Sequence, residues 1–364
     1  MAELFIELLS EEIPAKLQID AREKIKYAID ERLKKKEISF KTSESFSTPT
    51  KLVFIIKEIP EKIDQKKKVL KGPKSDAPQV ALDGFVKSNN LSKTNIYKKK
   101  IEKGEFYFAE TKPKVINVLE ELQLIIPEAL QAYSWKKSMK WADYNLNWAR
   151  PLKSIIALLN NKIINFNFFH LQSSNLTLVE GQNGDQVKII NSYKTYLNIL
   201  KSKNIILDHE KRKNLIIRKM NNVCNSKKLK NFFNQKLIEE VVNLVEKPNV
   251  IVGKFDEIYL KIPKEILILT MQQHQKYFPL FDLNNKLTNY FLLVSNLPDK
   301  KGYIKNGNQR VIEARLSDAK FFWDKNKNQN LIKQVGRLKN LLFFNKLGSF
   351  YDRTQRLKKL ASFV

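Results

Sequence analysis

The segment "KLVFIIKEI", residues 51–59, is an almost unbroken apolar run and is the strongest indication of a sheet in this sequence. It follows the Thr48-Pro49 step, where any preceding regular element is expected to end, since a residue before proline is biased towards extended backbone. A run of this length and composition predicts a β-strand. A second run, "ELFIELL" at residues 3–9, predicts a strand that opens the chain.

Outward from these strands, the sequence predicts a mixture of helices and strands. Pro14 suits the first turn of a helix, whose apolar face carries Leu17, Ala21, Ile25, Ala28, Ile29 and Leu33. The other predicted elements are a strand at 105–110, a helix at 116–133 interrupted by Pro127, a hairpin turning at Asn160-Asn161, helices over 193–246, strands in "NVIVGKF" and "EIYLKI", a helix started by Pro263, two strands joined at Asn284-Asn285, and helices from about 308 onward. This order indicates an α+β fold.

The expected domain boundary is the change from strands to helices near residue 300. Residues 1–300 are predicted to form a mixed α/β domain, with a possible sub-boundary near 190–200, and residues 301–364 a helical region. Residues 61–114 are rich in lysine and turn residues, with 14 basic and 7 acidic side chains. The final "DRTQRLKKLASFV" reads as an amphipathic helix without a cap, which predicts a truncated chain.

The charge of the chain favours a polyanionic partner. Its 66 Lys and Arg residues against 38 Asp and Glu give a net charge of +28 over 364 residues. Neutralising phosphates with such a surface releases counterions, so nucleic acid is the expected partner. Only ten of the basic residues are Arg, and Asn and Ile are abundant, so AT-rich codon usage accounts for part of the excess.

The single cysteine, Cys224, excludes an internal disulfide and a cysteine metal cluster, and fits a reducing cytosol. The opening "MAELFIELLSEE" has no basic residues before its apolar ones, so it is not a secretory signal. The longest apolar runs are far shorter than the roughly 18 residues of a membrane span. These features predict a cytoplasmic protein that does not insert into membranes.

Motifs of nucleotide or metal chemistry are missing from the sequence. It contains no phosphate-binding loop of the G-x-x-x-x-G-K-[ST] type, no G-x-G-x-x-G and no H-E-x-x-H. Of the three histidines, His170 and His209 read as structural residues, whereas His274, in "TMQQHQKYFPLF", could contact a phosphate or a ribose or could simply be packed. The chain therefore reads as a binding protein with no catalytic residue and no cofactor of its own.

The segment "NQRVIEARLSDAKFFWDKNKNQ", residues 308–329, predicts an amphipathic helix. Asn308 is its expected N-cap, and its apolar stripe consists of Ile312, Leu316, Ala319 and Trp323. Arg315 and Asp318 are three residues apart and are expected to form an ion pair. The alternative is that Arg315 contacts RNA or a neighbouring subunit.

Several stretches, taken in order, resemble the beta subunit of bacterial tetrameric glycyl-tRNA synthetase. The most specific are "ARLSDAKFFW" and "MQQHQKYFP". The others are "ELFIELLSEEIPAK", "FSTPTKL", "KGP", "GFVKSNNLS", "SMKWADYNLNWARPLKSIIALL", "LVEKPNVIVGKF", "VSNLPD" and "KLGSFYDRTQRL". Thr50 replaces the first arginine of the family's Thr-Pro-Arg-Arg-Leu segment. Two departures matter more: "NLTLVEGQNG" at 175–184 stands where the family shows Thr-Arg-Gly-His-Arg-Phe, and family members continue into a helical HD-like domain and a C-terminal anticodon-binding domain.

This resemblance implies a fold, partners and a reaction. Family members have an N-terminal part that resembles the editing-like domain of the phenylalanyl-tRNA synthetase beta subunit, followed by a helical HD-like domain, of which 301–364 would be the start. Their beta subunit binds glycine tRNA and completes an alpha2beta2 ligase, whose alpha subunit uses ATP and Mg to activate glycine. The chain itself would bind neither cofactor.

The resemblance and the charge together suggest which residues contact RNA or the neighbouring subunit. The candidates are Arg310, Arg315, Lys320, His274, Lys276, Arg353 and Arg356. Two other functions stay open at this point: an editing-type hydrolase that clears mischarged tRNA, and a scaffold that binds RNA without specificity.

Overall fold

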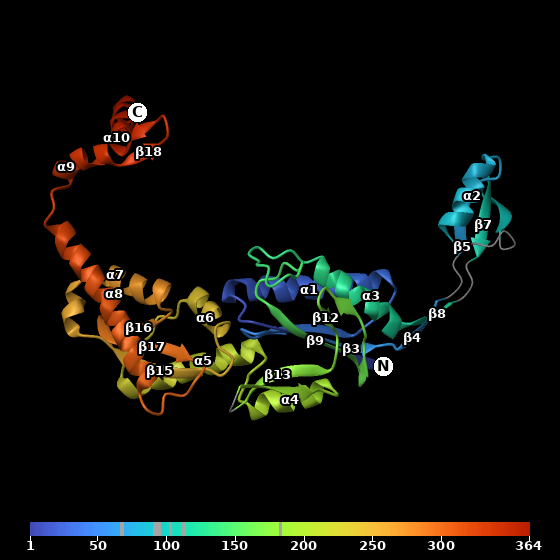
Figure 1. The fold of residues 1–364 in the computed structure, drawn as a ribbon, viewed down its shortest axis with the longest axis horizontal. Helices are drawn as coiled ribbons and strands as arrows, with labels where there is room; N and C mark the ends of the chain where they lie inside the picture. Colours follow the sequence, from blue (N-terminus) through green and yellow to red (C-terminus); the bar gives the residue numbers. More distant parts are fainter. Residues whose placement is uncertain (66–68, 90–95, 102–103, 111–113, 182–183) are drawn as a thin grey trace. The chain divides into compact units, whose positions relative to one another are not determined.

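A computed structural model describes residues 1–65, 69–89, 96–101, 104–110, 114–181 and 184–364 (Figure 1). Contacts divide the chain into two compact units, the first formed by residues 1–213 with 242–247 and the second by 214–241 with 248–364. Both units combine helices with antiparallel sheets, so the predicted α+β class is confirmed.

The first unit is built on a five-stranded antiparallel sheet. Its strand order is β10 (Lys162–Ile163), β9 (Leu152–Leu159), β1 (Ala2–Ser10), β3 (Lys51–Ile59) and β2 (Thr42–Ser47). The two strands predicted from apolar runs, β1 and β3, pair with each other, and Phe5 lies opposite Ile55. The predicted turn at Asn160-Asn161 connects β9 to β10, with Asn160 at a φ of 53°.

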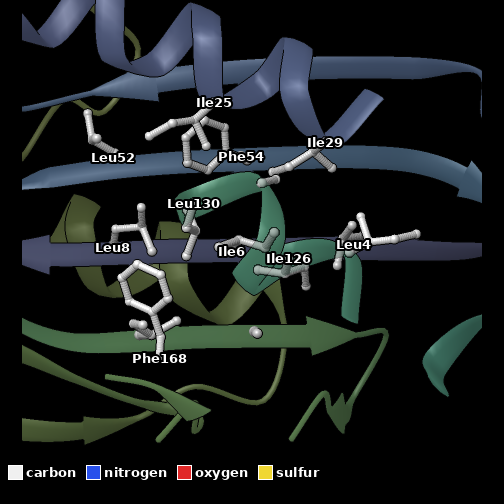
Figure 2. Close-up of a cluster of buried hydrophobic side chains, with 14 of the residues drawn as sticks. Leu4, Ile6, Leu8, Ile25, Ile29, Leu52, Phe54, Ile126, Leu130 and Phe168 are labelled. Atoms are coloured by element: carbon white, nitrogen blue, oxygen red, sulfur yellow. The ribbon is translucent and has the colours of Figure 1, made fainter. Parts of the chain in front are cut away.

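Both faces of this sheet are covered by helices, which explains why its strands are apolar at nearly every position. Helices α1 (Ala15–Lys35) and α3 (Val118–Gln131) cover one face, where side chains such as Leu4, Ile6 and Phe54 are buried (Figure 2). Helix α4 (Tyr193–Ser202) covers the other face, against Phe5 and its neighbours. Strands buried on two faces read as continuous apolar runs rather than as alternating ones.

The expectation that Pro127 interrupts a helix is wrong. Helix α3 runs without a break through Pro127. The residues around it, Ile125, Ile126, Ala129 and Leu130, are all buried in the core beneath α1. Burial of this apolar face outweighs the cost of a proline in the helix, which is about 3 kcal/mol.

The rest of the first unit consists of short strands and one more helix. A three-stranded sheet, β5-β7-β6, carries helix α2, and β4 pairs with β8. The segment 175–184 contributes β13 and the start of β14, although residues 182 and 183 lie outside the described part. The bounds are β4 (Lys62–Gln65), β5 (Val69–Lys74), α2 (Gln79–Ser88), β6 (Ile96–Ile101), β7 (Gly104–Glu110), β8 (Lys114–Asn117), β11 (Asn167–Phe168), β12 (Leu171–Gln172), β13 (Leu176–Gly181) and β14 (Gly184–Ile189).

The second unit is built on the antiparallel sheet β15-β17-β16, with strands β15 (Asn249–Lys254), β17 (Leu287–Ser295) and β16 (Phe278–Phe281). The helix expected after Pro263 is present as α7 (Lys264–Leu269) and continues as η3 (Thr270–His274). The strand predicted in "EIYLKI" is wrong, because these residues form the 3₁₀ helix η2 (Glu257–Lys261). Asp256 starts η2 by accepting the backbone N–H of Ile258.

The last part of the chain is mainly helical but contains a small hairpin that the sequence did not predict. Helix α8 (Tyr303–Lys327) shares a core with the sheet through Ile312 and Leu316, which pack with Phe291. The domain limit expected near 300 stays a prediction. After α8 come α9 (Leu331–Gln334), η4 (Val335–Asn340), β18 (Leu342–Phe344), β19 (Gly348–Ser349) and α10 (Phe350–Phe363).

The other helices are α5 (His209–Lys227) and α6 (Gln235–Val242), which fall in the region 193–246 predicted to be mainly helical. Among the described residues, no helix combines the length and the apolar character that a membrane span requires.

Candidate nucleic-acid interface

Helix α8 carries three of the seven candidate contact residues, and its start differs from the predicted one. The helix begins at Tyr303, after Gly302 in the left-handed region at a φ of 76°. The Asp299 carboxylate accepts the backbone N–H groups of Ile304 and Lys305, at 3.1 and 2.8 Å. An anionic oxygen at this helix end satisfies two unpaired donors and complements the helix dipole.

Asn308 is therefore not the N-cap; it lies inside the helix. Its amide donates to the carbonyl of Ile304 at 2.7 Å, and its side-chain oxygen accepts the Tyr277 hydroxyl at 2.5 Å. Tyr277 precedes β16 and is buried beside Phe291. Asn308 thus ties α8 to the sheet, a role that depends on a residue 31 positions away in the sequence.

The apolar stripe of α8 is confirmed where the helix meets the sheet. Ile312 and Leu316 have no exposed surface, and Ala319 packs at the margin of the same core. Trp323 is only half-buried. The buried stripe orients α8 so that the charged side chains on its other faces reach solvent.

The predicted ion pair between Arg315 and Asp318 does not form among the described residues; both side chains are exposed. The ion pair recorded on α8 joins Lys320 to Asp324 at 2.5 Å. A base that precedes an acid along a helix gives the weaker of the two orientations, because each charge then lies at the less favourable end of the helix dipole. Arg315 is the more exposed of these two cations and has no acidic partner among the described ion pairs.

Arg310 and Arg315 are both exposed, but they do not share one face of α8. Five residues correspond to a turn of about 140° around a helix axis. A ligand that lies along one side of the helix therefore meets only one of them, whereas a ligand that bridges two sides meets both. The two arginines are separate candidate contacts.

His274 and Lys276, at the end of η3, differ in exposure and in ion pairing. The His274 side chain is exposed and has no ion pair in the described part of the chain. Lys276 is half-buried and its Nζ lies 3.0 Å from Glu240 Oε1. Lys276 therefore stabilises the unit internally, and a contact with phosphate would have to compete with Glu240.

Arg353 and Arg356 lie on α10 and pack within the last helices and hairpin. The Arg353 guanidinium lies 4.7 Å above the Phe343 ring and 5.9 Å from the Phe350 ring. Arg356 donates to the carbonyl of Leu347 at 3.0 Å. Both side chains are exposed at the same time, so each retains donors that can reach a phosphate.

Sequence reasoning missed a group of buried charges in the first unit. Arg212 has no exposed surface and donates to the carbonyls of Val242, Ile206, Leu207 and Ser47, at 2.5 to 3.1 Å. Burial lowers the pKa of Arg212 to about 10. These four carbonyls come from three separate segments, so Arg212 acts as an internal tie rather than as an RNA contact.

Glu7 is the second buried charge, in the middle of β1. It has no exposed surface, and its carboxylate accepts a short hydrogen bond from the Thr177 hydroxyl. Burial raises the pKa of Glu7, and the attraction of Lys51 opposes this shift only in part. The one signal in the sequence was an acidic residue inside the apolar run "ELFIELL".

Comparison with known proteins gives one family. The family model of the glycyl-tRNA synthetase beta subunit matches residues 4–364. The chain is 35% identical to the glycine–tRNA ligase beta subunit of Rickettsia felis and 34% identical to that of Clostridioides difficile. The two alignments cover 100% and 99% of this chain.

The chain belongs to the glycyl-tRNA synthetase beta subunit family. It covers 55% of the Rickettsia felis protein and 53% of the Clostridioides difficile protein, so it spans about half the length of these relatives. The resemblance inferred from "ARLSDAKFFW" and "MQQHQKYFP" is confirmed. The first stretch lies within α8 and includes both buried and exposed positions of that helix, and the second lies at the junction of η3 and β16.

The described residues also show the surroundings of potential metal ligands and of the three histidines. They contain no group of three or more His, Cys, Asp or Glu side chains that could hold a metal ion. His170 stacks on Tyr144, with ring centroids 3.8 Å apart, and His209 lies against Phe46. The two histidines read as structural thus make ring contacts, and exposed His274 has no charged partner in the described part with which to activate a nucleophile.

Proposed function

We propose that this chain is a tRNA-binding, non-catalytic part of a glycine–tRNA ligase that contains an alpha and a beta subunit. The observation that carries the proposal is the family match over residues 4–364. The net charge of +28 supports it, because a tRNA backbone is a polyanion. The exposed Arg310 and Arg315 are the leading phosphate contacts.

The division of labour in this proposal places ATP and Mg in the alpha subunit, in an alpha2beta2 assembly that works in the cytoplasm. The five-stranded sheet unit would share the fold of the editing-like domain of the phenylalanyl-tRNA synthetase beta subunit without its hydrolytic activity. The exposed position of His274, with no acidic partner among the described ion pairs, supports a binding role over a hydrolytic one.

Sedimentation of the chain with a glycyl-tRNA synthetase alpha subunit and glycine tRNA tests this function. We expect one complex that contains all three components. A complex that contains the RNA but does not include the added alpha subunit would indicate an independent RNA-binding protein, and a chain that binds neither component would contradict the proposal. Deacylation of mischarged tRNA that disappears in His274→Ala would instead favour a hydrolase.

A further inference from the structure

The small sheet β5-β7-β6 has two faces of different character. In an antiparallel sheet, residues opposite each other in register lie on the same face, and neighbours along a strand alternate. Helix α2 covers one face: a Cβ added to Gly72 would lie 2.9 Å from the Phe85 ring of α2, and Ala109 has no exposed surface. No described element is recorded on the second face.

The register defines the residues of this uncovered face. Lys71 lies opposite Phe108, which lies opposite Tyr97 on the other neighbouring strand. In the next row, Lys74 and Lys99 lie on either side of Phe106. We call these six residues the lysine–aromatic face: Lys71, Lys74, Tyr97, Lys99, Phe106 and Phe108.

The rings of the lysine–aromatic face are arranged as a platform. Tyr97 and Phe108 stack at 6.1 Å between centroids with 23° between their planes. Phe106 and Phe108 are two residues apart on the central strand, a separation of about 7 Å, which leaves room for two neighbouring bases. Tyr97 is exposed and the two phenylalanines are half-buried, so their faces are within reach of a ligand.

The lysines of this face supply the complementary charge. Lys71, Lys74 and Lys99 are all exposed. The Lys71 Nζ lies 3.7 Å above the Phe106 ring. A base that stacks on this ring therefore has to displace the exposed Lys71 ammonium, which would then be available to the adjacent phosphate. Glu110, the last residue of the central strand β7, lies opposite Val69 in the row beyond Lys71. Phenyl rings with lysines on both sides match a ligand that alternates flat bases with phosphates.

We propose that the lysine–aromatic face binds unpaired RNA nucleotides, with bases stacked on Phe106 and Phe108 and phosphates held by the three lysines. Proteins that bind single strands combine such rings with a basic surface, and sheet-surface aromatics stack bases in small RNA-binding domains. A duplex cannot use this face in the same way, because its bases are stacked on one another. The inference rests on the proposed RNA-binding function and adds the kind of RNA and the surface.

Fluorescence anisotropy on the whole chain tests the inference, with a labelled eight-nucleotide single-stranded RNA and a labelled RNA duplex of equal charge as probes. Phe106→Leu and Phe108→Leu keep apolar bulk but remove the rings. We expect each to weaken single-strand binding about tenfold and to leave duplex binding unchanged.

The two faces of the same strands provide matched controls. Lys98 and Lys99 are adjacent on β6 and both exposed, but they lie on opposite faces, with the Lys98 Nζ near Tyr107. Lys99→Gln should weaken single-strand binding more than Lys98→Gln, although both remove one charge. Tyr107→Leu on the α2 side controls for loss of folding and should not change binding beyond its effect on stability.

The outcomes separate this inference from the proposed function. Equal effects of Lys98→Gln and Lys99→Gln, or equal losses of single strand and duplex in Phe106→Leu, would overturn the stacking surface. Binding of tRNA without any binding of the single strand would also overturn it, while leaving the RNA-binding function intact. Equal affinity for polyglutamate and for the single strand would show a polyanion surface that does not use its rings.

Discussion

Glu7 places a titratable carboxyl in the core of the first unit, beside the Tyr196 ring of α4 and with Thr177 and Lys51 as its polar neighbours. Its pKa is raised above 4.5 by burial. An acid whose folded pKa is raised contributes stability that is fully present below its unfolded pKa and is lost as the pH rises through the folded pKa.

Replacing Glu7 with glutamine removes this pH dependence of stability. The amide keeps an acceptor for Thr177 and cannot ionise. As the pH rises from about 5 to about 8, the free energy of unfolding of the variant should therefore increase relative to that of the wild type. Urea unfolding at several pH values measures the difference. Glu12→Gln, at an exposed carboxyl of the same segment, should show no such trend. A pH-independent difference for Glu7→Gln contradicts the account.

For Arg315, the ion pair expected from the sequence differs from the arrangement found in the structure. The sequence allowed an ion pair with Asp318, but the structure shows two exposed side chains that are not paired. The spacing of three residues was readable from the sequence, whereas the choice between rotamers on a solvated helix face depends on the orientation of each side chain. A pair of this kind contributes at most about 1 kcal/mol, so neither outcome affects the fold.

Arg315→Ala should therefore change binding more than stability. We expect the free energy of unfolding to stay within about 0.5 kcal/mol of the wild type, because the side chain is exposed. Affinity for tRNA should fall, and the salt dependence of log affinity should become shallower by about one counterion. Arg315→Lys, which keeps the charge, should restore most of the affinity. A loss of stability with unchanged affinity would show that Arg315 is structural.

Among the secondary-structure elements, most of the long apolar strands and helices could be predicted from the sequence. The continuity of α3 and the 3₁₀ conformation of η2 could not. β1, β3, α1 and α8 have strong periodicity or continuous apolar runs, and tertiary packing agrees with these patterns. The uninterrupted α3 depends on burial against α1, which a propensity argument at Pro127 does not contain. η2 depends on the Asp256 cap, which overrides the β-forming residues of "EIYLKI".

Alanine substitutions at two glycines, Gly253 and Gly307, should change stability in opposite directions, because the space around the two Cα atoms differs. A Cβ on Gly253 of β15 would lie 2.3 Å from the Phe291 ring, so Gly253→Ala should destabilise the chain by about 1–3 kcal/mol. A Cβ on Gly307 of α8 would meet nothing within 4 Å, so Gly307→Ala should stabilise it by about 0.5–1 kcal/mol. Chemical denaturation measures both changes. Similar effects at the two positions would show that strand–strand packing at Phe291 is not tight.

At the scale of the whole molecule, the candidate interface was only partly readable from the sequence. The charge and the motifs predicted an RNA-binding member of the family; Arg310, Arg315 and His274 are exposed, and their contact with RNA stays a prediction. The pairing of Lys276 with Glu240 and the buried Arg212 tie involve residues far apart in the sequence, so no local pattern reveals them. The lysine–aromatic face required the register of β5, β6 and β7.

Binding of this chain to glycine tRNA and to an unrelated tRNA, measured across a salt titration, tests whether the chain recognises tRNA. We predict that both affinities fall linearly on a log–log plot of affinity against salt, with glycine tRNA bound more tightly at physiological salt. Equal affinities that collapse together with salt would show that the charge of +28 acts only electrostatically. Absence of binding to either tRNA, even at low salt, would contradict the account.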